Sequence, residues 1–215
     1  QWRECVSAWR QLQSDEDAVF DREYTIECSD IAPTVTWGIS PQHAIPVDGT
    51  VPQLDDTADE ETRRNMQLAL SYMGVKPGQA ILGLPIHGAF IGSCTNGRLR
   101  DLREAAAVLD GRKVAKGIRA ICTPGSRQVK LAAEAEGLDK VFLDAGFEWR
   151  EPGCSLCFNA GGEGFGPEER VVSSTNRNFR GRQGRKTRTH LGSPASVAAS
   201  AVAGQIADAR EVVKP

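Results

Sequence analysis

The sequence predicts an α/β fold built on a mostly parallel sheet that is covered on both faces, and two observations support this prediction. From residue 89 onward, a short apolar segment, a turn containing glycine or proline and a helical pattern follow one another repeatedly. That alternation is typical of parallel strands joined by helical crossovers. The composition agrees, because 40% hydrophobic residues, 25% charged residues and 22 glycines are ordinary values for a globular α/β chain.

The N-terminal part of the chain has a less regular pattern. Trp2 and Trp9 belong to a helical pattern, and residues 24–28 alternate between apolar and polar side chains as a strand does. Residues 31–61 contain four prolines and end in an acidic run, which makes them a poor candidate for regular structure. We therefore place a domain boundary near residue 55.

Beyond this boundary, helical and strand patterns alternate. Helices are expected at residues 61–73, 98–109, 127–136 and from 194 to about 210. Short strands are expected at residues 89–92, 117–122 and 170–173, while residues 139–145 fit either a helix or a strand. In parallel sheets the loops at the carboxyl ends of the strands form the ligand-binding crevice, and the most unusual loops of this chain occupy such positions.

The formal net charge of −2 conceals an uneven distribution of charge. Residues 1–61 contain 14 acidic and 3 basic residues, so the rest of the chain carries a net positive charge. Seven bases lie from Arg170 to Arg188, both ends included, and no acidic residue occurs between Glu169 and Asp208. The asymmetry indicates one basic loop rather than a generally basic chain.

Several classes of protein are disfavoured by the sequence. No segment approaches the roughly 18 consecutive apolar residues of a membrane-spanning helix. The N-terminus has no secretory signal pattern, and it begins without Met, which we interpret as a piece of a longer polypeptide. Six cysteines are too few for a disulfide scaffold of this length, so we expect a reducing compartment, the cytoplasm.

Three cysteines lie on loops that follow expected strands or turns. Cys94 comes directly after the strand at residues 89–92, and Cys154 and Cys157 form a C-x-x-C pair. Three converging thiolates fit an iron–sulfur cluster with one open iron better than a closed zinc site, which needs a fourth ligand. The spacing alone is equally compatible with a small buried Cys94 and a chance or redox-active C-x-x-C pair.

The other potential metal ligands are expected to be structural, because no motif places them at ligand spacing. These residues are Cys5, Cys28, Cys122, His43, His87 and His190. No histidine or glutamate lies in a motif that would identify it as a general base.

The sequence STNRNFRGRQG at residues 174–184 forms a second candidate site. Arg177 and Arg182 carry planar guanidinium groups that suit bidentate binding of carboxylate or phosphate, and Asn176 adds neutral hydrogen bonds. Glycines allow the backbone to turn around a small ligand. A solvated basic loop or a nucleic-acid-binding patch would have a similar composition, although Phe179 alone offers an aromatic ring there for base stacking.

Together these motifs resemble those of the aconitase superfamily. The resemblance is carried by GSCTN at residues 92–96, PGCSLC at residues 152–157 and NRNFRGR at residues 176–182, and it extends in order over essentially the whole chain. Within the superfamily, the chain is most similar to the C-terminal portion of the 3-isopropylmalate dehydratase large subunits. The resemblance implies a three-layer α/β/α aconitase-type domain at residues 55–215, preceded at residues 1–54 by the tail of another such domain and a linker.

The resemblance implies a [4Fe-4S] cluster in which Cys94, Cys154 and Cys157 bind three irons and leave the fourth for the substrate hydroxyl and carboxylate. The implied reaction isomerises 2-isopropylmalate and 3-isopropylmalate in leucine biosynthesis, by dehydration and then rehydration. In such a hydro-lyase the iron makes the hydroxyl a better leaving group while a base removes a proton from the neighbouring carbon.

By the same resemblance, Asn176, Arg177 and Arg182 bind the carboxylates of a small di- or tricarboxylate. The implied partners are a small subunit, which forms the swivelling domain, and the rest of the large subunit; neither a membrane nor nucleic acid is expected. The acid and base groups are expected outside this chain, so the chain alone is expected to be inactive. Two alternatives remain open: a related hydro-lyase acting on citramalate, dimethylmalate or homoaconitate, and a non-enzymatic RNA-binding relative.

Three departures from the family pattern fall near the expected crevice. Gly97 replaces a common serine, and Arg127 and Gln128 replace a small or apolar pair. The sequence FNAGG follows Cys157, where a run containing Met and Asn is usual. These departures concern the identity of the substrate more than the type of reaction.

Overall fold

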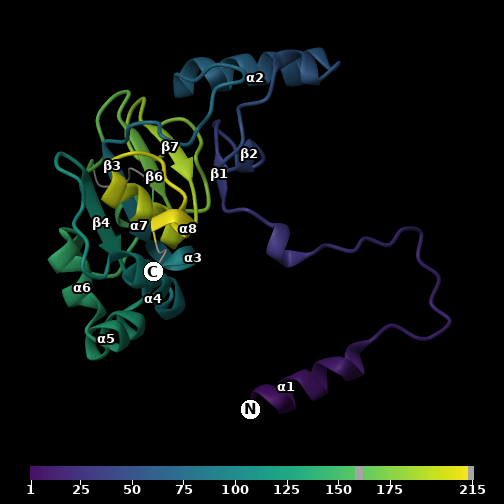
Figure 1. Cartoon of the computed structure of the whole chain (residues 1–215). Helices are drawn as coiled ribbons and strands as arrows, with labels where there is room; N and C mark the ends of the chain where they lie inside the picture. Colours follow the sequence, from purple (N-terminus) through teal and green to yellow (C-terminus); the bar gives the residue numbers. More distant parts are fainter. Residues whose placement is uncertain (158–161, 213–215) are drawn as a thin grey trace. The chain divides into compact units, whose positions relative to one another are not determined.

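The computed structural model describes residues 1–157 and 162–212 (Figure 1). Its contacts divide the chain into two compact units, Gln1–Ile31 and Ala32–Pro215. Among the described residues, none of the helices combines the length and the apolar character needed to cross a membrane.

The first unit consists of a short helix and an irregular segment. Helix α1 spans Trp2–Trp9 and confirms the helical pattern, and its two tryptophan rings meet edge to face with their centroids 5.7 Å apart. Short 3-10 helices lie at Arg10–Leu12 and Cys28–Asp30. The strand predicted at residues 24–28 is wrong, because the described residues offer this segment no neighbouring strand to complete its backbone hydrogen bonds.

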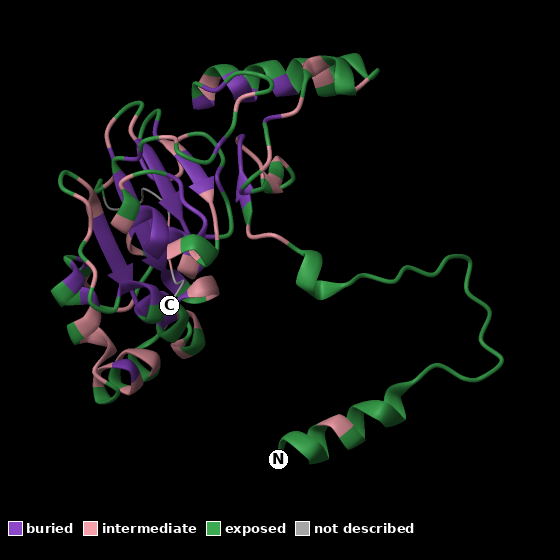
Figure 2. Ribbon diagram, in the orientation of Figure 1, coloured by how far each residue is buried: buried purple, intermediate pink, exposed green. Residues whose placement is uncertain are grey.

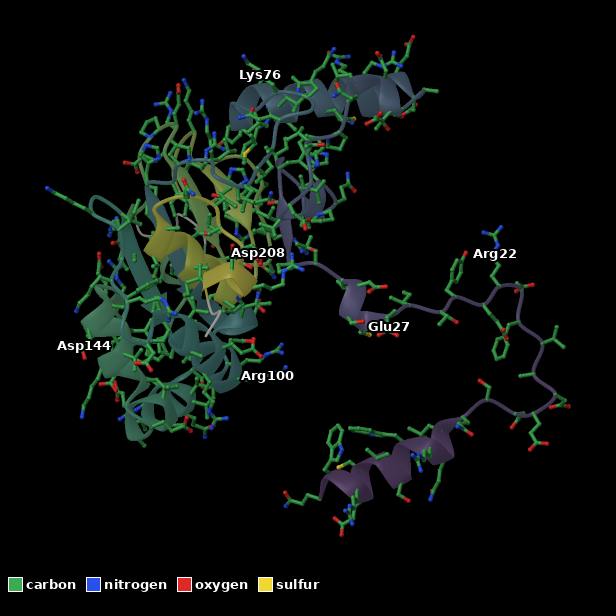
Figure 3. The ribbon with its side chains drawn as sticks, in the orientation of Figure 1. Arg22, Glu27, Lys76, Arg100, Asp144 and Asp208 are labelled. Atoms are coloured by element: carbon green, nitrogen blue, oxygen red, sulfur yellow. The ribbon has the colours of Figure 1, made fainter. Side chains whose placement is uncertain are left out.

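Side chains of the first unit remain in contact with solvent. In this unit, which the structure describes throughout, every residue is exposed except Val6, which is half-buried (Figure 2). Large apolar side chains such as those of Trp2 and Phe20 are 72% and 54% exposed, and the charged side chains of Arg22 and Glu27 also extend away from the backbone (Figure 3). Since so little apolar area is removed from water, the unit has no core of its own.

The second unit contains a five-stranded sheet in which every pair of neighbouring strands is parallel. Its strands are, in spatial order, β5 (Glu148–Trp149), β4 (Arg119–Thr123), β3 (Gly88–Gly92), β6 (Arg170–Ser173) and β7 (Arg188–Leu191). The three predicted strands correspond to β3, β4 and β6, whereas β5 and β7 were not predicted. Every residue of β3 is buried, as expected for the central strand of a parallel sheet.

Successive residues of the central strand point to different layers. Ala89 and Ile91 pack in the main core, which also contains residues of helices α4 (Leu99–Leu109) and α7 (Pro194–Ala203). Phe90 faces the other way, into a smaller apolar cluster formed with connecting segments. The α/β class and the parallel sheet are therefore confirmed. Within the described part of the chain, helices pack against one face of the sheet and connecting segments cover the other.

Local capping signals define the first long helix of this unit. Helix α2 (Glu60–Met73) begins after Asp59, whose carboxylate accepts a hydrogen bond from the Thr62 amide at 2.8 Å. It ends at Gly74, which adopts the left-handed conformation with φ of 61°. Helix α5 (Arg127–Ala135), which lies between β4 and β5 in the sequence, also agrees with its predicted position.

The last predicted helix is shorter than expected. Helix α7 ends at Gly204, which adopts φ of 70° and whose amide closes on the Ser200 carbonyl, and the chain resumes as α8 (Ala209–Val212). An isolated glycine in an alanine-rich helical pattern is therefore a true stop signal here. The ambiguous residues 139–145 belong to a helix, α6 (Leu138–Ala145).

The segment at residues 32–54 is more regular than its prolines suggested. Strands β1 (Thr34–Thr36) and β2 (Ala44–Pro46) form an antiparallel pair, in which Pro46 is tolerated because it ends a two-stranded edge. Four side chains of the segment are buried in the main core: Val35, Trp37, Val47 and Val51. These contacts group residues 32–54 with the second unit, while their assignment to a preceding domain, with a boundary near residue 55, stays a prediction.

A buried arginine and a buried histidine join the end of α2 to strands β6, β7 and β1. Arg170 donates hydrogen bonds to Nε2 of His190 at 2.6 Å and to the Met73 carbonyl at 3.1 Å. Because Arg170 can only donate, His190 accepts at Nε2, and its Nδ1 donates to the Thr36 carbonyl at 2.6 Å. Burial and the nearby Arg170 charge lower the pKa of His190 to about 3, so the ring is neutral and structural.

The stability of the chain should fall as this histidine titrates. Its folded-state pKa lies below the ordinary value of 6.5, so the unfolded chain binds the proton more readily and stability is lost as the pH falls from 6.5 toward 3. His190 should contribute up to about 1.4 kcal/mol per pH unit to that slope of the unfolding free energy. Urea unfolding at a series of pH values should show a slope smaller by about one proton in His190→Gln. Equal slopes in the two proteins would contradict the assignment.

Candidate functional site

The carboxyl ends of β3, β5 and β6 lie at one edge of the sheet, because all the strands run parallel. Cys94 follows β3, and Cys154 and Cys157 follow β5. The basic loop at residues 176–182 follows β6. The topology thus brings the three predicted motifs to the same edge.

The chain leaves β3 through a tight turn. Gly92 has φ of 128°, and a Cβ atom there would lie 1.9 Å from the Thr123 carbonyl oxygen, so only glycine fits. Ser93 follows with φ of 66°, a left-handed conformation that costs a non-glycine residue about 1 kcal/mol or more. A short helix, α3 (Ser93–Asn96), forms where we expected a turn, and it presents Cys94 as an exposed residue.

Two glycines hold the loops after β3 and β4 together. The Gly125 amide donates to the Gly97 carbonyl at 2.8 Å. A Cβ atom at residue 97 would lie 2.6 Å from the Ser93 carbonyl oxygen and 2.9 Å from the Gly125 nitrogen. The departure from serine at this position therefore coincides with backbone packed too closely for a side chain. The other departing pair, Arg127 and Gln128, is exposed at the start of α5.

The C-x-x-C turn is fixed by the residues between its cysteines. Leu156 is fully buried in the smaller apolar cluster, and Ser155 has φ of 41°. The Cys157 amide donates to the Cys154 carbonyl at 2.7 Å. With Leu156 held inside, Cys154 is exposed and Cys157 is half-buried. Residues 158–161, most of the unusual FNAGG sequence, lie outside the described residues.

Ion pairs fasten both ends of the segment that carries this turn. Arg150, before the turn, pairs with Glu163, after it, at 2.6 Å, and Arg119 of β4 also pairs with Glu163. Hydrogen bonds from Arg150, and to a lesser degree from Arg119, lower the pKa of Glu163 to about 2. The Glu163 carboxylate therefore stays ionised at neutral pH, and its ion pair with Arg150 holds the two ends of the segment together.

The three cysteines line one cavity of about 210 Å³. Its wall is formed by Ser93, Cys94, Gly125, Gly153, Cys154 and Cys157. The structure therefore brings together all three predicted cluster ligands, although they come from two loops that are distant in sequence. Their role as ligands stays a prediction.

The donor set at the cavity consists of three thiols, the ligand type that holds iron–sulfur clusters. Nowhere in the described part of the chain do three or more His, Cys, Asp or Glu side chains group closely enough to hold one metal ion. A cluster distributes its thiolate ligands over different irons and therefore needs a cavity rather than a point of convergence. The Ser93 hydroxyl at the wall is buried and has no hydrogen-bond partner among the described residues, so it could donate to a cluster sulfide.

Arg182 joins the basic loop to the cysteine site. Its Nη2 donates to the Sγ atom of Cys157 at 3.0 Å and to Oδ1 of Asn176 at 3.1 Å. Its Nε atom is buried without a partner among the described residues, and its Cζ lies 5.3 Å from the ring centroid of Phe179. Contacts with Cys157, Asn176 and Phe179 thus orient one guanidinium beside a predicted cluster ligand.

Arg177 occupies a different place from the other two predicted carboxylate-binding residues. Arg177 is exposed, and its Nη1 donates to the Asn176 carbonyl at 3.2 Å. Asn176 and Arg182 therefore meet at the cysteine site, whereas Arg177 lies on the surface of the loop. Its contact with a substrate stays a prediction.

The remaining cysteines and histidines lie away from the cavity wall. Cys122 is buried in β4, where burial raises its thiol pKa well above the ordinary value, and Cys5 and Cys28 are exposed in the first unit. His43 stacks on a tryptophan ring with the centroids 4.5 Å apart, and His87 accepts a backbone hydrogen bond at Nδ1 at 3.1 Å. The two histidines thus make contacts within the fold, and their purely structural role stays a prediction.

Polar side chains of the motifs, beyond the predicted ligand-binding residues, tie the loops together. The Ser174 hydroxyl accepts from the Gly92 amide at 3.0 Å, and the Ser174 carbonyl accepts from the side chain of Asn96. The buried Asn178 donates through Nδ2 to the Gly38 carbonyl at 2.6 Å. The sequence shows that small polar residues lie beside the strand ends. It does not show which of them form hydrogen bonds with each other, because the partners are far apart in the sequence.

Helix α2 supports the basic loop through one tyrosine. The Tyr72 hydroxyl accepts a hydrogen bond from the Gly181 amide at 3.0 Å and donates to the Thr187 carbonyl at 2.9 Å. The guanidinium of Arg180 also lies over its ring, 5.7 Å from the centroid. Tyr72 thus spans the loop from its glycine turn to the residue before β7.

Comparison with known proteins gives consistent matches. The profile of the Aconitase family (aconitate hydratase) matches residues 1–204. The 3-isopropylmalate dehydratase large subunit of Cupriavidus necator is 62% identical over 210 residues, which cover 98% of this chain and 79% of that protein. Proteins named 3-isopropylmalate dehydratase large subunit 1 are 59% identical in Bradyrhizobium diazoefficiens and 53% identical in Mannheimia succiniciproducens. These alignments cover 97% and 99% of this chain, but only 44% and 45% of the respective relatives.

Removal of the Tyr72 hydroxyl should loosen the basic loop. Tyr72→Phe leaves one amide and one carbonyl without their partner, which should cost about 1–2 kcal/mol of stability. Hydrogen–deuterium exchange should show faster exchange at Gly181, while the matched change Tyr24→Phe, at an exposed residue, should leave it unaltered. Unchanged protection of Gly181 in Tyr72→Phe would show that the tyrosine does not anchor the loop.

Proposed function

Because the chain belongs to the aconitase family, we propose that it supplies the cluster-binding and carboxylate-binding part of an iron–sulfur hydro-lyase. The proposed enzyme interconverts 2-isopropylmalate and 3-isopropylmalate by dehydration and rehydration in leucine biosynthesis. The observation that carries the proposal is that three cysteines line one cavity and that Arg182 donates a hydrogen bond to Cys157. The names of the three relatives favour isopropylmalate over other malate derivatives.

The cysteines of the cavity would hold a [4Fe-4S] cluster through three of its irons. Cys94, Cys154 and Cys157 are free thiols, and no other residue type among the described residues of the cavity wall offers a strong metal ligand. When bound, the cluster supplies a Lewis-acidic iron that lacks a thiolate and can polarise a substrate hydroxyl. The Ser93 hydroxyl, which has no partner in the described chain, would donate a hydrogen bond to the cluster.

Arg182 and Asn176 would bind and orient a substrate carboxylate. The bond to Asn176 and the contact with Phe179 fix the guanidinium plane, so its free N–H groups meet the carboxylate in a set orientation. Negative charge builds up on a carboxylate when the proton on the adjacent carbon is removed, and a fixed cation stabilises it. No acidic residue occurs in the sequence between Glu169 and Asp208, so no carboxylate of the loop competes for these donors.

The groups that move protons would come from other parts of the enzyme. The described wall of the cavity consists of serine, cysteine and glycine, none of which is a general base at neutral pH without activation. We propose that the rest of a large subunit and a separate small subunit complete the site, and that this chain alone is inactive. A cytoplasmic location would keep its six cysteines reduced.

Cluster binding can be tested by anaerobic reconstitution with iron and sulfide. The chain should turn brown, and Cys94→Ala, Cys154→Ala and Cys157→Ala should each lower the bound iron by about tenfold or more. Cys28→Ala is the matched control, because it removes an exposed thiol of the first unit and should leave the iron content unchanged. A colourless wild-type protein, or a triple variant that binds iron as well as the wild type, would refute the proposal.

A further inference from the structure

One buried carboxamide contacts three segments that meet beneath the cysteine site, the C-x-x-C turn, β6 and β7. Gln183 is 0% exposed, and its Nε2 donates to the Leu156 carbonyl at 2.8 Å and to the Ser173 hydroxyl at 3.1 Å. Its Oε1 accepts from the Thr189 hydroxyl at 3.0 Å. Both donor hydrogens and the acceptor of the carboxamide are therefore used, which is how a buried amide avoids its desolvation cost.

The partners of Gln183 are the parts of the site that must be held in register. Leu156 lies between Cys154 and Cys157, and its carbonyl belongs to the turn that presents both thiols. Ser173 ends β6. Arg182, whose guanidinium contacts Cys157, is the residue before Gln183. One side chain thus connects the C-x-x-C turn, the sheet and the basic loop.

The backbone of Gln183 is fixed as firmly as its side chain. Its carbonyl accepts a hydrogen bond from the Phe165 amide at 2.8 Å. The next residue, Gly184, has φ of 143°, and a Cβ atom there would lie 2.2 Å from the Phe165 carbonyl oxygen. The carboxamide therefore projects from a backbone that has little freedom to move.

The C-x-x-C turn needs such support. Ser155 adopts φ of 41°, a conformation that a non-glycine residue keeps only where its surroundings hold it. The burial of Leu156 anchors its side chain, but it does not fix the orientation of the Leu156 carbonyl group. The hydrogen bond from Gln183 fixes that carbonyl.

We propose that Gln183 is a positioning residue that sets the place of the C-x-x-C turn relative to Arg182 and so keeps the cysteine cavity ready for a cluster. The effect of Gln183 on a cluster rests on the proposed function, whereas its effect on the order of the C-x-x-C turn does not. Gln183 touches neither the cavity wall nor the substrate-binding atoms of Arg182, so it acts through Leu156.

Two variants and one control test the proposal. Gln183→Met keeps the length of the side chain but removes the donor to Leu156, and Thr189→Val removes only the bond that orients the carboxamide. Gln67→Met makes the same chemical change at an exposed residue of α2. Circular dichroism and urea unfolding first establish that each variant is folded. If Gln183→Met does not fold, Thr189→Val alone tests the positioning role.

The first measurement uses the cluster-free chain. The Cys157 amide, which is bonded to the Cys154 carbonyl, should exchange its hydrogen about tenfold faster in Gln183→Met and by a smaller factor in Thr189→Val. Gln67→Met should exchange as the wild type does. Wild-type protection of Cys157 in both folded site variants would overturn the positioning role.

The second measurement uses the reconstituted chain. The variants should release iron to a chelator up to about tenfold faster than the wild type. After reduction with dithionite to the paramagnetic +1 state, the electron paramagnetic resonance signal of their cluster should be broader than that of the wild type, because the turn has more than one position. A general loss of stability would not change that line shape. If the wild type binds no cluster, the proposed function fails while the exchange experiment still decides the role of Gln183. If the wild type binds one and the variants match it in release rate and line shape, the positioning of the cluster is refuted.

Discussion

The parallel pairing of β3 with both of its neighbours is the constraint on which the site depends. In register, Gly92 at the end of β3 lies opposite Thr123 of β4, and Phe90 lies opposite Ser173 of β6. Chains that leave such strands must leave from the same edge of the sheet. The absence of a side chain at Gly92 lets the first of these loops pass directly over the β4 backbone. A cavity shared by distant segments follows from this arrangement.

The two faces of the sheet contribute in different ways. The helical face provides most of the apolar burial, through the core that joins α4, α7 and the inward residues of β3. On the opposite face the described residues form a small apolar cluster, and the polar side chain of Gln183 lies fully buried beneath the cysteine turn. Apolar packing therefore stabilises the unit, whereas directional hydrogen bonds position the site, as expected where geometry matters more than burial alone.

Sequence patterns predicted the elements whose signals are local. The helical pattern at residues 61–73 located α2, whereas the alanine-rich pattern predicted a helix to about residue 210 and missed the stop at Gly204, where α7 ends. The alternating pattern at residues 24–28 was misleading, because a strand requires a partner that the pattern cannot supply.

The candidate site was predictable only in part. The motif around Cys94 and the C-x-x-C pair identified candidate ligands, since their residue types and loop positions are visible locally. The resemblance to a family then assigned them to one cluster. The roles of Tyr72 and Gln183 were hidden, because each depends on hydrogen bonds that close only when the fold brings separate segments together.

Mössbauer spectroscopy of the chain reconstituted with ⁵⁷Fe tests the central claim most directly. Three cysteines bound to a four-iron cluster leave one iron without a thiolate, so the spectrum should contain three irons of one kind and one of another. The odd iron alone should change when a malate-type dicarboxylate is added, and the change should be lost in Arg182→Gln. Four equivalent irons, or a spectrum indifferent to the dicarboxylate, would contradict the account.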